Sequence, residues 1–436
     1  MGSAPAKLPR AVVLGVEHPR GVAVIRSLGR RGISVVAVER NASARGLWSR
    51  YVSDTLLVDD DPGQAVSALE HLGRNGGGVL IPTSDHFLML VSRHFDRLSK
   101  DFIVTVPPWE VLEGVMDKPQ CYRLGREAGL GTPRFFTPAE PAALDRVVAS
   151  LDFSAHRYVL SVRLPDPRPV DPVTGRMTKA AGNDADTVRQ NCLDIASRTG
   201  QLPMIIEVIP GRSDRCVGVS MMVNRLHEPV VAYCVRRLQL YLYSLDTGFI
   251  HPYELGANVY CESVRDDEAI EAATKFVRHA GFYGAITVEF RRDPTDGGLK
   301  LIKADPRMVR ATSLSAALGL DIPAALYRAF TDGRIDVAPS YPEGVAWLWP
   351  TWYLETIWGN RARTPMAAEL WALLKHGRRI KAFAYLDLRD PLPGMVDATR
   401  AARSWLRAGG RRALPSHSAL GRLARAARRG LRPTAR

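Results

Sequence analysis

Short β-branched runs alternate with helical segments through the first 107 residues, and this alternation constrains the fold more than any other feature. Residues 11–16 (AVVLGV) and 33–40 (ISVVAVER) are apolar runs of strand length, and residues 20–32 between them have apolar side chains at helical spacing before a glycine. Three further runs follow, DTLLVDD, GVLIPTSD and FIVTVPP. Strands that alternate with helices form parallel sheets. The sequence therefore predicts a parallel sheet of about five strands.

The loop after the first predicted strand lacks the glycine pattern of a dinucleotide-binding site. Gly15 and Gly21 flank the residues VEHPR, which depart from G-x-G-x-x-G, although Glu39 ends the second strand where a ribose-binding acid would lie. We therefore do not expect NAD binding. Ligands of such sheets bind at the carboxyl ends of the strands. This predicts that a small-molecule substrate contacts the loops GVEHPRG and PTSDHF.

Residues 288–308, VEFRRDPTDGGLKLIKADPRM, predict a β-hairpin that carries charge on one face. The stretch Asp-Pro-Thr-Asp-Gly-Gly favours a tight turn, because proline presets φ and glycine accepts positive φ. With the turn centred in this stretch, Glu289 lies roughly opposite Lys303, and Asp305 shares their face because side chains alternate along a strand. The three charges are either an ordinary solvated ion pair or part of a functional site.

The composition is that of a globular protein with two or three domains. The chain has 436 residues, 46% of them hydrophobic, and five scattered cysteines without a C-x-x-C pair. This argues against a zinc site and against a secreted disulfide scaffold, so we expect a cytoplasmic protein. Residues 1–10 (MGSAPAKLPR) lack the apolar run expected of a signal peptide, and no stretch reaches the roughly 18 apolar residues expected of a membrane span. The tryptophan-rich residues 345–359 come closest, but Pro350 and Glu355 interrupt them, which favours packing in the core.

Much of the net charge of +14 lies in the C-terminal tail. Residues 403–436 contain ten arginines and no acidic residue. Residues 418–431 place apolar side chains near one helical face, so this tail could bind nucleic acid or an anionic membrane. We favour the simpler interpretation, a solvated end of the chain.

Three further segments place polar residues beside predicted strands and helices. Lys118 precedes a helix that is followed by glycines and a proline. Residues 158–165 (YVLSVRLP) and 204–211 (MIIEVIPG) are strand runs, and between them residues 171–188 form a polar, glycine-containing stretch that suits a flap. Taken singly, a lysine at a helix start is usually solvated, and a glutamate before Pro-Gly usually belongs to a turn.

The order of these segments resembles that of the ATP-grasp superfamily. The chain has, in order, DKP before a helix, a strand with a basic residue, a flap, EVIPG, YGAITVEF, a hairpin and DPR. This order is similar to that of the superfamily's carboxylate-amine ligases and of the ATP-binding halves of carbamoyl-phosphate synthase large chains. The resemblance runs from about residue 10 to 335. It implies an α/β protein in which an N-terminal parallel-sheet, Rossmann-like domain precedes an ATP-grasp fold of two α+β lobes and a C-terminal α/β appendage with a basic tail.

The resemblance also implies domain boundaries. We expect an N-terminal domain over residues 1–107, a linker helix and flap lobe over 108–205, a nucleotide and metal lobe over 206–335, an appendage over 336–400 and the basic tail over 401–436. Because family members often dimerise, the resemblance implies a homodimer as well.

The activity that the resemblance implies is ATP-dependent ligation. ATP phosphorylates a small-molecule carboxylate to an acyl phosphate, and an amine attacks it to give an amide. Such chemistry needs cations on the phosphates and carboxylates that hold Mg²⁺. The implied roles are ATP binding for Lys118, Arg163, Lys179 and Glu207, magnesium binding for Glu289 and Asp305, and catalysis for Lys303 and Arg307.

The sequence departs from the family pattern at the metal ligands. It has K-A-D-P-R where the family usually has E-x-N-P-R, and the ammonium of Lys303 would pair with Glu289 instead of coordinating Mg²⁺. Arg163 replaces a usual lysine, and Gln239 stands where relatives often have an arginine. Three functions remain open: a ligase with a modified one-metal site, an inactive ATP-grasp protein that binds nucleotide or substrate or supports a partner enzyme, and a surface-binding protein that acts through its basic tail.

Overall fold

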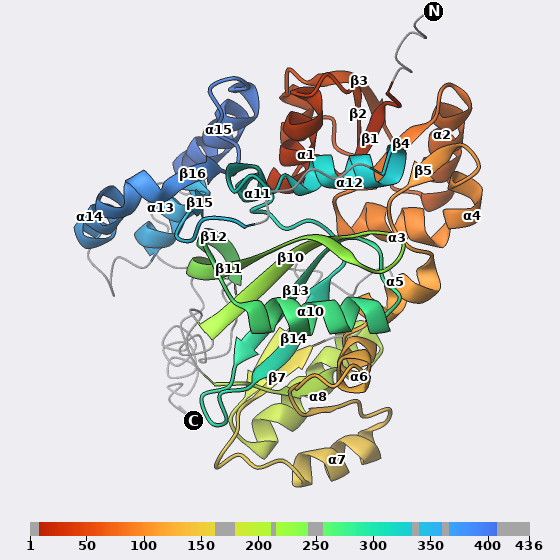
Figure 1. The fold of residues 1–436 in the computed structure, drawn as a ribbon. Helices are drawn as coiled ribbons and strands as arrows, with labels where there is room; N and C mark the ends of the chain where they lie inside the picture. Colours follow the sequence, from red (N-terminus) through yellow and green to blue (C-terminus); the bar gives the residue numbers. More distant parts are fainter. Residues whose placement is uncertain are drawn as a thin grey trace, which may run out of the picture.

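The structure is a computed structural model that describes residues 8–161, 179–210, 215–242, 256–333, 340–359 and 366–407 (Figure 1). Arg163 and the basic tail beyond residue 407 lie outside the described residues. Lys179 begins a described strand, but its side chain lies outside them as well. Along the described ranges, no helix is both long enough and apolar enough to cross a membrane.

The N-terminal residues form the predicted parallel sheet. Its strands run in the order β3-β2-β1-β4-β5, and every neighbouring pair is parallel. The strands are β1 (Ala11–Leu14), β2 (Val35–Glu39), β3 (Val52–Leu57), β4 (Gly78–Pro82) and β5 (Phe102–Val104). The strand order reverses between β1 and β4, so the loops that follow these two strands lie beside each other at the carboxyl edge, where sheets of this type bind ligands.

Helices cover this sheet, and one of them also faces the rest of the molecule. They are α1 (Pro19–Gly29), η1 (Arg45–Trp48), α2 (Pro62–Arg74), α3 (Asp85–Arg93) and α4 (Phe95–Leu98). Residues 19–28 of α1 are all buried, because α1 contacts β1 and β2 as well as α11 (Ser313–Ala317) and α12 (Ile322–Thr331), which come much later in the chain (Figure 1).

Two linker helices lead from the N-terminal domain to a small lobe. They are α5 (Trp109–Met116) and α6 (Lys118–Glu127). The small lobe has a four-stranded sheet of order β6-β9-β7-β8 with α7 (Pro141–Ala149) and α8 (Ala185–Thr199). Its strands are β6 (Phe135–Phe136), β7 (Tyr158–Ser161), β8 (Lys179–Gly182) and β9 (Met204–Glu207). Its side chains form a separate apolar core around Tyr158 and Val188.

The large lobe is built on a seven-stranded sheet of order β14-β13-β10-β11-β12-β15-β16. Its strands are β10 (Cys216–Val223), β11 (Pro229–Leu242), β12 (Gly256–Val264), β13 (Gly284–Arg292), β14 (Leu299–Asp305), β15 (Ala346–Leu348) and β16 (Ile380–Phe383). Helix α10 (Asp267–His279) contacts β10 and β11, and α13 (Pro350–Gly359), α14 (Met366–His376) and α15 (Leu392–Arg407) follow in the C-terminal part. The segment expected as an appendage therefore supplies the last two strands of this sheet.

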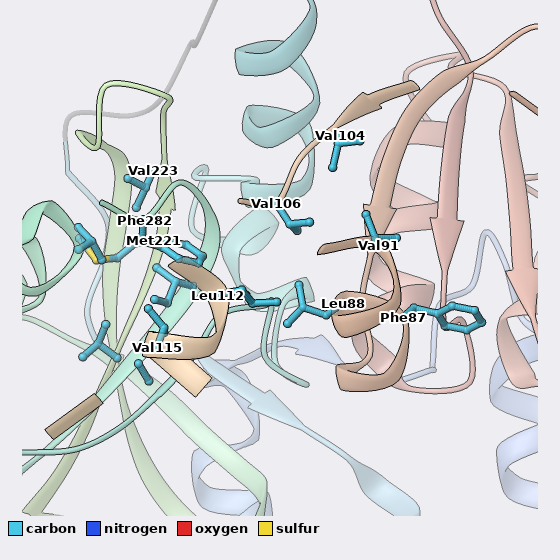
Figure 2. Close-up of a cluster of buried hydrophobic side chains, with 14 of the residues drawn as sticks. Phe87, Leu88, Val91, Val104, Val106, Leu112, Val115, Met221, Val223 and Phe282 are labelled. Carbon is cyan, nitrogen blue, oxygen red and sulfur yellow. The ribbon is translucent and has the colours of Figure 1, made fainter. Parts of the chain in front are cut away.

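One apolar cluster connects the N-terminal domain, the linker helices and the large lobe (Figure 2). It includes Leu88 of α3, Leu112 and Val115 of α5, and Met221 of β10, all of them buried. Burial of side chains of this kind stabilises by about 1.5–3 kcal/mol each. The carboxyl edge of the parallel sheet is thereby held in a fixed position beside the seven-stranded sheet.

The C-terminal segment is fastened to α1 by ion pairs. Asp390 is 1% exposed and accepts a 2.8 Å hydrogen bond from Arg26, and it also accepts from Ser49 Oγ at 2.8 Å. Asp387 pairs with Arg30 near the surface. Through these contacts the two aspartates hold the C-terminal segment to the N-terminal domain. The tryptophan-rich segment is core, as predicted: Trp347 and Trp349 are buried.

Candidate functional site

The charged hairpin has the predicted register. In the β13–β14 pair, Glu289 lies opposite Lys303, and Asp305 lies two residues further along the same face. The turn closes through a 2.8 Å hydrogen bond from Gly297 N–H to the Asp293 carbonyl. Gly297 has φ +70°, which only glycine adopts without strain. Local turn chemistry thus sets which charged side chains meet.

Lys303 lies between the two carboxylates of the hairpin. Its Nζ is 3.2 Å from Glu289 Oε1 and 2.7 Å from Asp305 Oδ2. The pairing of Lys303 with Glu289 is the one expected from the sequence, and the structure adds the shorter contact with Asp305, so the ammonium lies between the two acids.

Arg237 on β11 is a member of this cluster that the sequence reasoning missed. Its guanidinium forms an ion pair with Glu289, while the neighbouring Arg236 pairs with Glu262. In the sequence, the position where relatives often have an arginine aligns with Gln239, whose side chain lies outside the described residues. Register irregularities around Gln239 shift the alternation of β11 at this point. The signal in the sequence was the pair of adjacent arginines in CVRRLQ. Because successive side chains of a strand point to opposite faces, one arginine of the pair lies on the same face of the sheet as the charged cluster.

The charges of the cluster hold one another in the ionised state. Burial alone would raise the pKa of Glu289, but Arg237 and Lys303 outweigh it and lower the pKa. Burial would likewise raise the pKa of Asp305, and Lys303 and Arg307 bring it well below its usual range. Burial would lower the pKa of Lys303, yet Asp305 and Glu289 raise it. In a partly buried array of this kind, removing one charge leaves its partners without full compensation.

Arg307 connects the hairpin to the N-terminal domain. Its Nε donates to the carboxylate of Asp85, and its Nη2 lies 3.6 Å from Asp305 Oδ1. Asp85 begins α3, where the side chain of Ser84 caps the helix by accepting from Phe87 N–H. The loop PTSDHF, predicted to contact a ligand, therefore supplies a carboxylate to the same cluster.

The other predicted loop lies against PTSDHF. Thr83 Oγ1 donates to the Gly15 carbonyl at 2.5 Å. Gly15 has φ +86°, and a Cβ there would be 2.7 Å from Ser84 Oγ, so the two loops approach closely only because this residue is glycine. Glu39, considered as a ribose ligand, accepts hydrogen bonds from the backbone N–H groups of Glu17 and Arg40. Its carboxylate holds the loop.

The loop after β1 brings a buried arginine to the cluster. Arg20 is 5% exposed, and burial followed by the charges of Arg307 and Arg310 lowers its pKa. Burial and the charge of Arg20 also lower the pKa of His18, to about 3, so this imidazole is neutral at ordinary pH. Neither Arg20 nor Arg310 was a sequence-predicted site residue.

Lys118 lies near the hairpin, at the start of α6. This helix contacts β14, and Tyr122 Oη donates to the Ile302 carbonyl at 2.9 Å. The Lys118 Nζ is 5.9 Å from the centre of the Tyr122 ring. Burial raises the pKa of the Cys121 thiol to about 12, and both Lys118 and Asp305 act on that thiol electrostatically. Lys118 therefore lies close to the charged hairpin.

Glu207 lies on the small lobe at the end of β9. Its Oε1 is 3.1 Å from Nδ1 of His156, and its buried Oε2 is 3.9 Å from Arg134 Nε but accepts no hydrogen bond from the described residues. Among the described residues, no ion pair or hydrogen bond joins Glu207 to the charged hairpin. The chain just after it does approach β13, because Arg291 Nη1 donates to the Ile209 carbonyl at 2.8 Å.

The donor set does not fit a resident magnesium ion. Mg²⁺ prefers octahedral oxygen ligands, and the ammonium of Lys303 lies between the two carboxylates that would supply them. In the part of the chain that the structure describes, no group of three histidine, cysteine or acidic side chains is arranged to hold a metal. We therefore assign no chemical step to a bound metal.

Comparisons with known proteins identify the fold. No model of a protein family matches the chain, and no curated protein matches it. The biotin carboxylase domain of 2-oxoglutarate carboxylase from Hydrogenobacter thermophilus, solved as a dimer with MgADP, ADP and bicarbonate, is similar with a TM-score of 0.58 and 13% identity, over 78% of this chain and 73% of that one. N5-carboxyaminoimidazole synthetase from Staphylococcus aureus is similar with a TM-score of 0.56 and 13% identity, over 79% of this chain and 82% of that one.

A third solved structure agrees with these two. N5-carboxyaminoimidazole ribonucleotide synthetase from Thermus thermophilus is similar with a TM-score of 0.56 and 15% identity, over 77% of this chain and 81% of that one. Likeness at such low identity establishes architecture, and function must be argued from the site. The chain has the α/β fold of biotin carboxylases and N5-carboxyaminoimidazole synthetases, in which an N-terminal parallel-sheet domain precedes the two lobes of an ATP-grasp fold.

Proposed function

We propose that this protein binds ATP between its two lobes and uses it to ligate a carboxylate to an amine. The observation that carries the proposal is the charged cluster on β13 and β14, where Glu289, Lys303, Asp305 and Arg307 lie together beside Lys118. Phosphoryl transfer depends on positioning and charge neutralisation, and this cluster is rich in fixed cations. The MgADP and bicarbonate bound by the neighbour from Hydrogenobacter thermophilus support a nucleotide and a small carboxylate as ligands.

The proposed reaction has two steps. A carboxylate oxygen takes the γ-phosphoryl group of ATP, which forms an acyl phosphate and releases ADP. The amine nitrogen then attacks the acyl carbon, a C–N bond forms, the C–O bond to phosphate breaks, and the amine proton leaves to solvent. Lys118 and Arg307 would bind the phosphates, and Glu207 would lie at the adenine and ribose. Arg163 and Lys179 would add cations from the flap.

Through Lys303, this ligase would differ from proteins of the same fold in how it neutralises the phosphates of ATP. Its ammonium carries the positive charge that a metal supplies elsewhere, and it would neutralise phosphate oxygens that approach Glu289 and Asp305. One observation also favours a second function, nucleotide binding without turnover: the ammonium is already paired with two carboxylates, which reduces the charge available to a transferring phosphoryl group.

Calorimetric titration with ATP, once with excess Mg²⁺ and once with EDTA, tests the proposal. We expect ATP to bind in both, because fixed cations replace the metal. ADP release that depends on an added carboxylate and amine would establish ligation, and tight binding without any ADP release would establish the second function. A protein that does not bind ATP under either condition contradicts both.

Two matched variants localise the binding. Lys118→Met should weaken ATP binding about tenfold or more, because it removes a charge-assisted hydrogen bond to phosphate. Lys275→Met is the control, since Lys275 lies on the exposed face of α10 and pairs only with Glu271 one helical turn away. Equal affinity of the two variants would remove Lys118 from the nucleotide site. Size-exclusion chromatography with light scattering tests the homodimer that we propose from the dimeric neighbour.

A further inference from the structure

Arg20 is the most unusual charged residue of the described structure. It is 5% exposed, its Nε is buried without a hydrogen-bond partner, and no ion pair compensates it among the described residues. Arginine is almost never fully buried without a partner, because the desolvation of an uncompensated guanidinium is expensive. Arg20 belongs to the loop GVEHPRG, which the sequence predicts to contact a small-molecule substrate, yet the proposed reaction leaves this arginine without a role.

Arg310 is partly exposed, but it too has a buried Nε that lacks a hydrogen-bond partner among the described residues. Its guanidinium lies 5.8 Å from the centre of the Trp352 ring. Helix α1, which carries Arg20, contacts α11, which begins three residues after Arg310, and the charge of Arg310 lowers the pKa of Arg20, so the two guanidinium groups repel each other. Two like charges disfavour each other's charged form, and an anion that contacts both would relieve this repulsion.

Nearby carboxylates do not supply that anion. Asp85 and Asp305 both act on Arg20, but Asp85 is engaged by Arg307, and Asp305 is engaged by Lys303 at 2.7 Å and by Arg307 at 3.6 Å. Arg20 and Arg310 join Arg237, Lys303 and Arg307 in a set of five cations, which shares the three carboxylates of Glu289, Asp305 and Asp85. Within this set of described residues, two positive charges have no matching carboxylate.

The surroundings also suit an anion. Arg20 is in the first turn of α1, an eleven-residue helix whose positive end faces the same region. The neighbouring His18 remains neutral, so it adds a polar ring without competing for negative charge. The loop lies at the point of the parallel sheet where the strand order reverses, which is the usual place for a ligand in such sheets.

We propose that Arg20 and Arg310 bind a dianionic group of the substrate, either a phosphate monoester or a pair of carboxylates. One negative charge would leave one arginine uncompensated, whereas two match both. The assignment of this ligand as substrate rests on the proposed ligase function, because the two arginines adjoin Arg307, where the acyl phosphate would form. The anion site itself can be measured without ATP.

The test is calorimetric titration of the full-length protein, without nucleotide, with inorganic phosphate, malonate and acetate at equal ionic strength. We expect phosphate or malonate to bind about tenfold or more tightly than acetate. Preference for phosphate would indicate a phosphate monoester, and preference for malonate a dicarboxylic acid. Acetate binding as tightly as both dianions, or no binding by any of the three, overturns the proposal.

Three variants assign the binding to the arginines. Arg20→Met and Arg310→Met should each weaken dianion binding about tenfold or more. Arg225→Met is the matched control, because Arg225 also lies over an aromatic ring, that of Phe330 at 5.1 Å, but outside the cluster. Its dianion affinity should stay within about twofold of the parent. Equal losses in all three variants, or no loss in the first two, contradict the assignment.

Thermal unfolding gives an independent readout. Arg20→Met removes an uncompensated buried charge, so this variant should melt at a higher temperature than the parent and lose the stabilisation that the parent gains from the dianion. If Arg20→Met does not fold, the stabilisation by the dianion is compared between the parent and Arg310→Met, because Arg310 is partly exposed and easier to replace. A folded Arg20→Met that still gains the full stabilisation from the dianion refutes the site.

ATP titrations separate this site from the nucleotide site. Arg20→Met should bind ATP within about threefold of the parent, and phosphate should still bind when ATP is saturating. If ATP displaces phosphate and Arg20→Met weakens both equally, the arginines belong to the nucleotide site and the proposal fails. A parent protein that binds the dianion through Arg20 but never binds ATP retains the anion site and loses the ligase function.

Discussion

Replacing Lys303 by methionine tests how the charged hairpin is neutralised. The substitution keeps an unbranched side chain, one atom shorter, and removes the ammonium from between Glu289 and Asp305. Two acids then face each other, with Arg237 and Arg307 as their remaining partners. We expect a loss of stability and, in its place, a new affinity for Mg²⁺, because the carboxylates become available as oxygen ligands.

The size of the loss follows from distance and exposure. Two unit charges at about 4 Å interact by about 4 kcal/mol at an effective dielectric constant of about 20. Removing one partner of a fully buried pair costs about 3–5 kcal/mol, and an exposed pair contributes about 0–1 kcal/mol. The Lys303 side chain is 39% exposed, so solvent screens part of the interaction. We expect Lys303→Met to cost about 2 kcal/mol.

Urea unfolding, monitored by tryptophan fluorescence with and without Mg²⁺, measures both effects. A site with Kd of about 1 mM would regain about 1.4 kcal/mol at about 10 mM Mg²⁺, whereas the parent should not respond to Mg²⁺. Lys300→Met is the matched control, because Lys300 lies on the same strand and pairs with Asp296 near the turn at 2.6 Å. If Lys303→Met is as stable as the parent and indifferent to Mg²⁺, the ammonium does not neutralise these carboxylates.

Three further predictions concern the rest of the scaffold. The pKa of His18 is lowered to about 3 in the folded protein, so the unfolded chain binds the proton more tightly and the free energy of unfolding falls as the pH drops below about 6.5. In urea unfolding, His18→Asn should lose about 1 kcal/mol less stability than the parent between pH 7.5 and 5.5, and an equal loss in both proteins would contradict the lowered pKa. Asp390→Ala should cost about 3–5 kcal/mol in the same assay and Asp387→Ala about 0–1, because only the first aspartate is fully buried with its arginine; equal costs would contradict this. Gly15→Ala should lower the melting temperature more than Gly32→Ala, since both have positive φ but only Gly15 has side-chain atoms where a Cβ would lie, and equal shifts would rule out the clash.

The features predicted correctly from the sequence are those with local causes. Strand and helix alternation fixed the five-stranded parallel sheet, and proline and glycine fixed the hairpin turn. Once the turn is placed, alternation of side chains decides that Glu289 and Lys303 meet. The same locality explains why Asp305 was placed on the same face.

The features that were missed depend on segments far apart in the chain. Arg237 reaches Glu289 across the intervening strand β10. The register of β11 is irregular near Gln239, so the sequence pattern pointed to Gln239 instead of Arg237 as the residue at this site. Arg20 becomes a buried charge only because α11 and α12 cover its helix. Neither fact is visible in the residues nearby, since packing of distant elements overrides local pattern.

The ion pair between Arg26 and Asp390 has a consequence for the order of synthesis. These residues are 364 positions apart. At about 5–20 residues per second, the ribosome would release Asp390 roughly 20 to 70 s after Arg26. Until then the N-terminal domain carries a cation whose buried partner does not yet exist. A nascent chain can therefore assemble its first sheet early but must complete the surface around α1 last, and a truncated product would retain an unfinished face that chaperones and proteases can recognise.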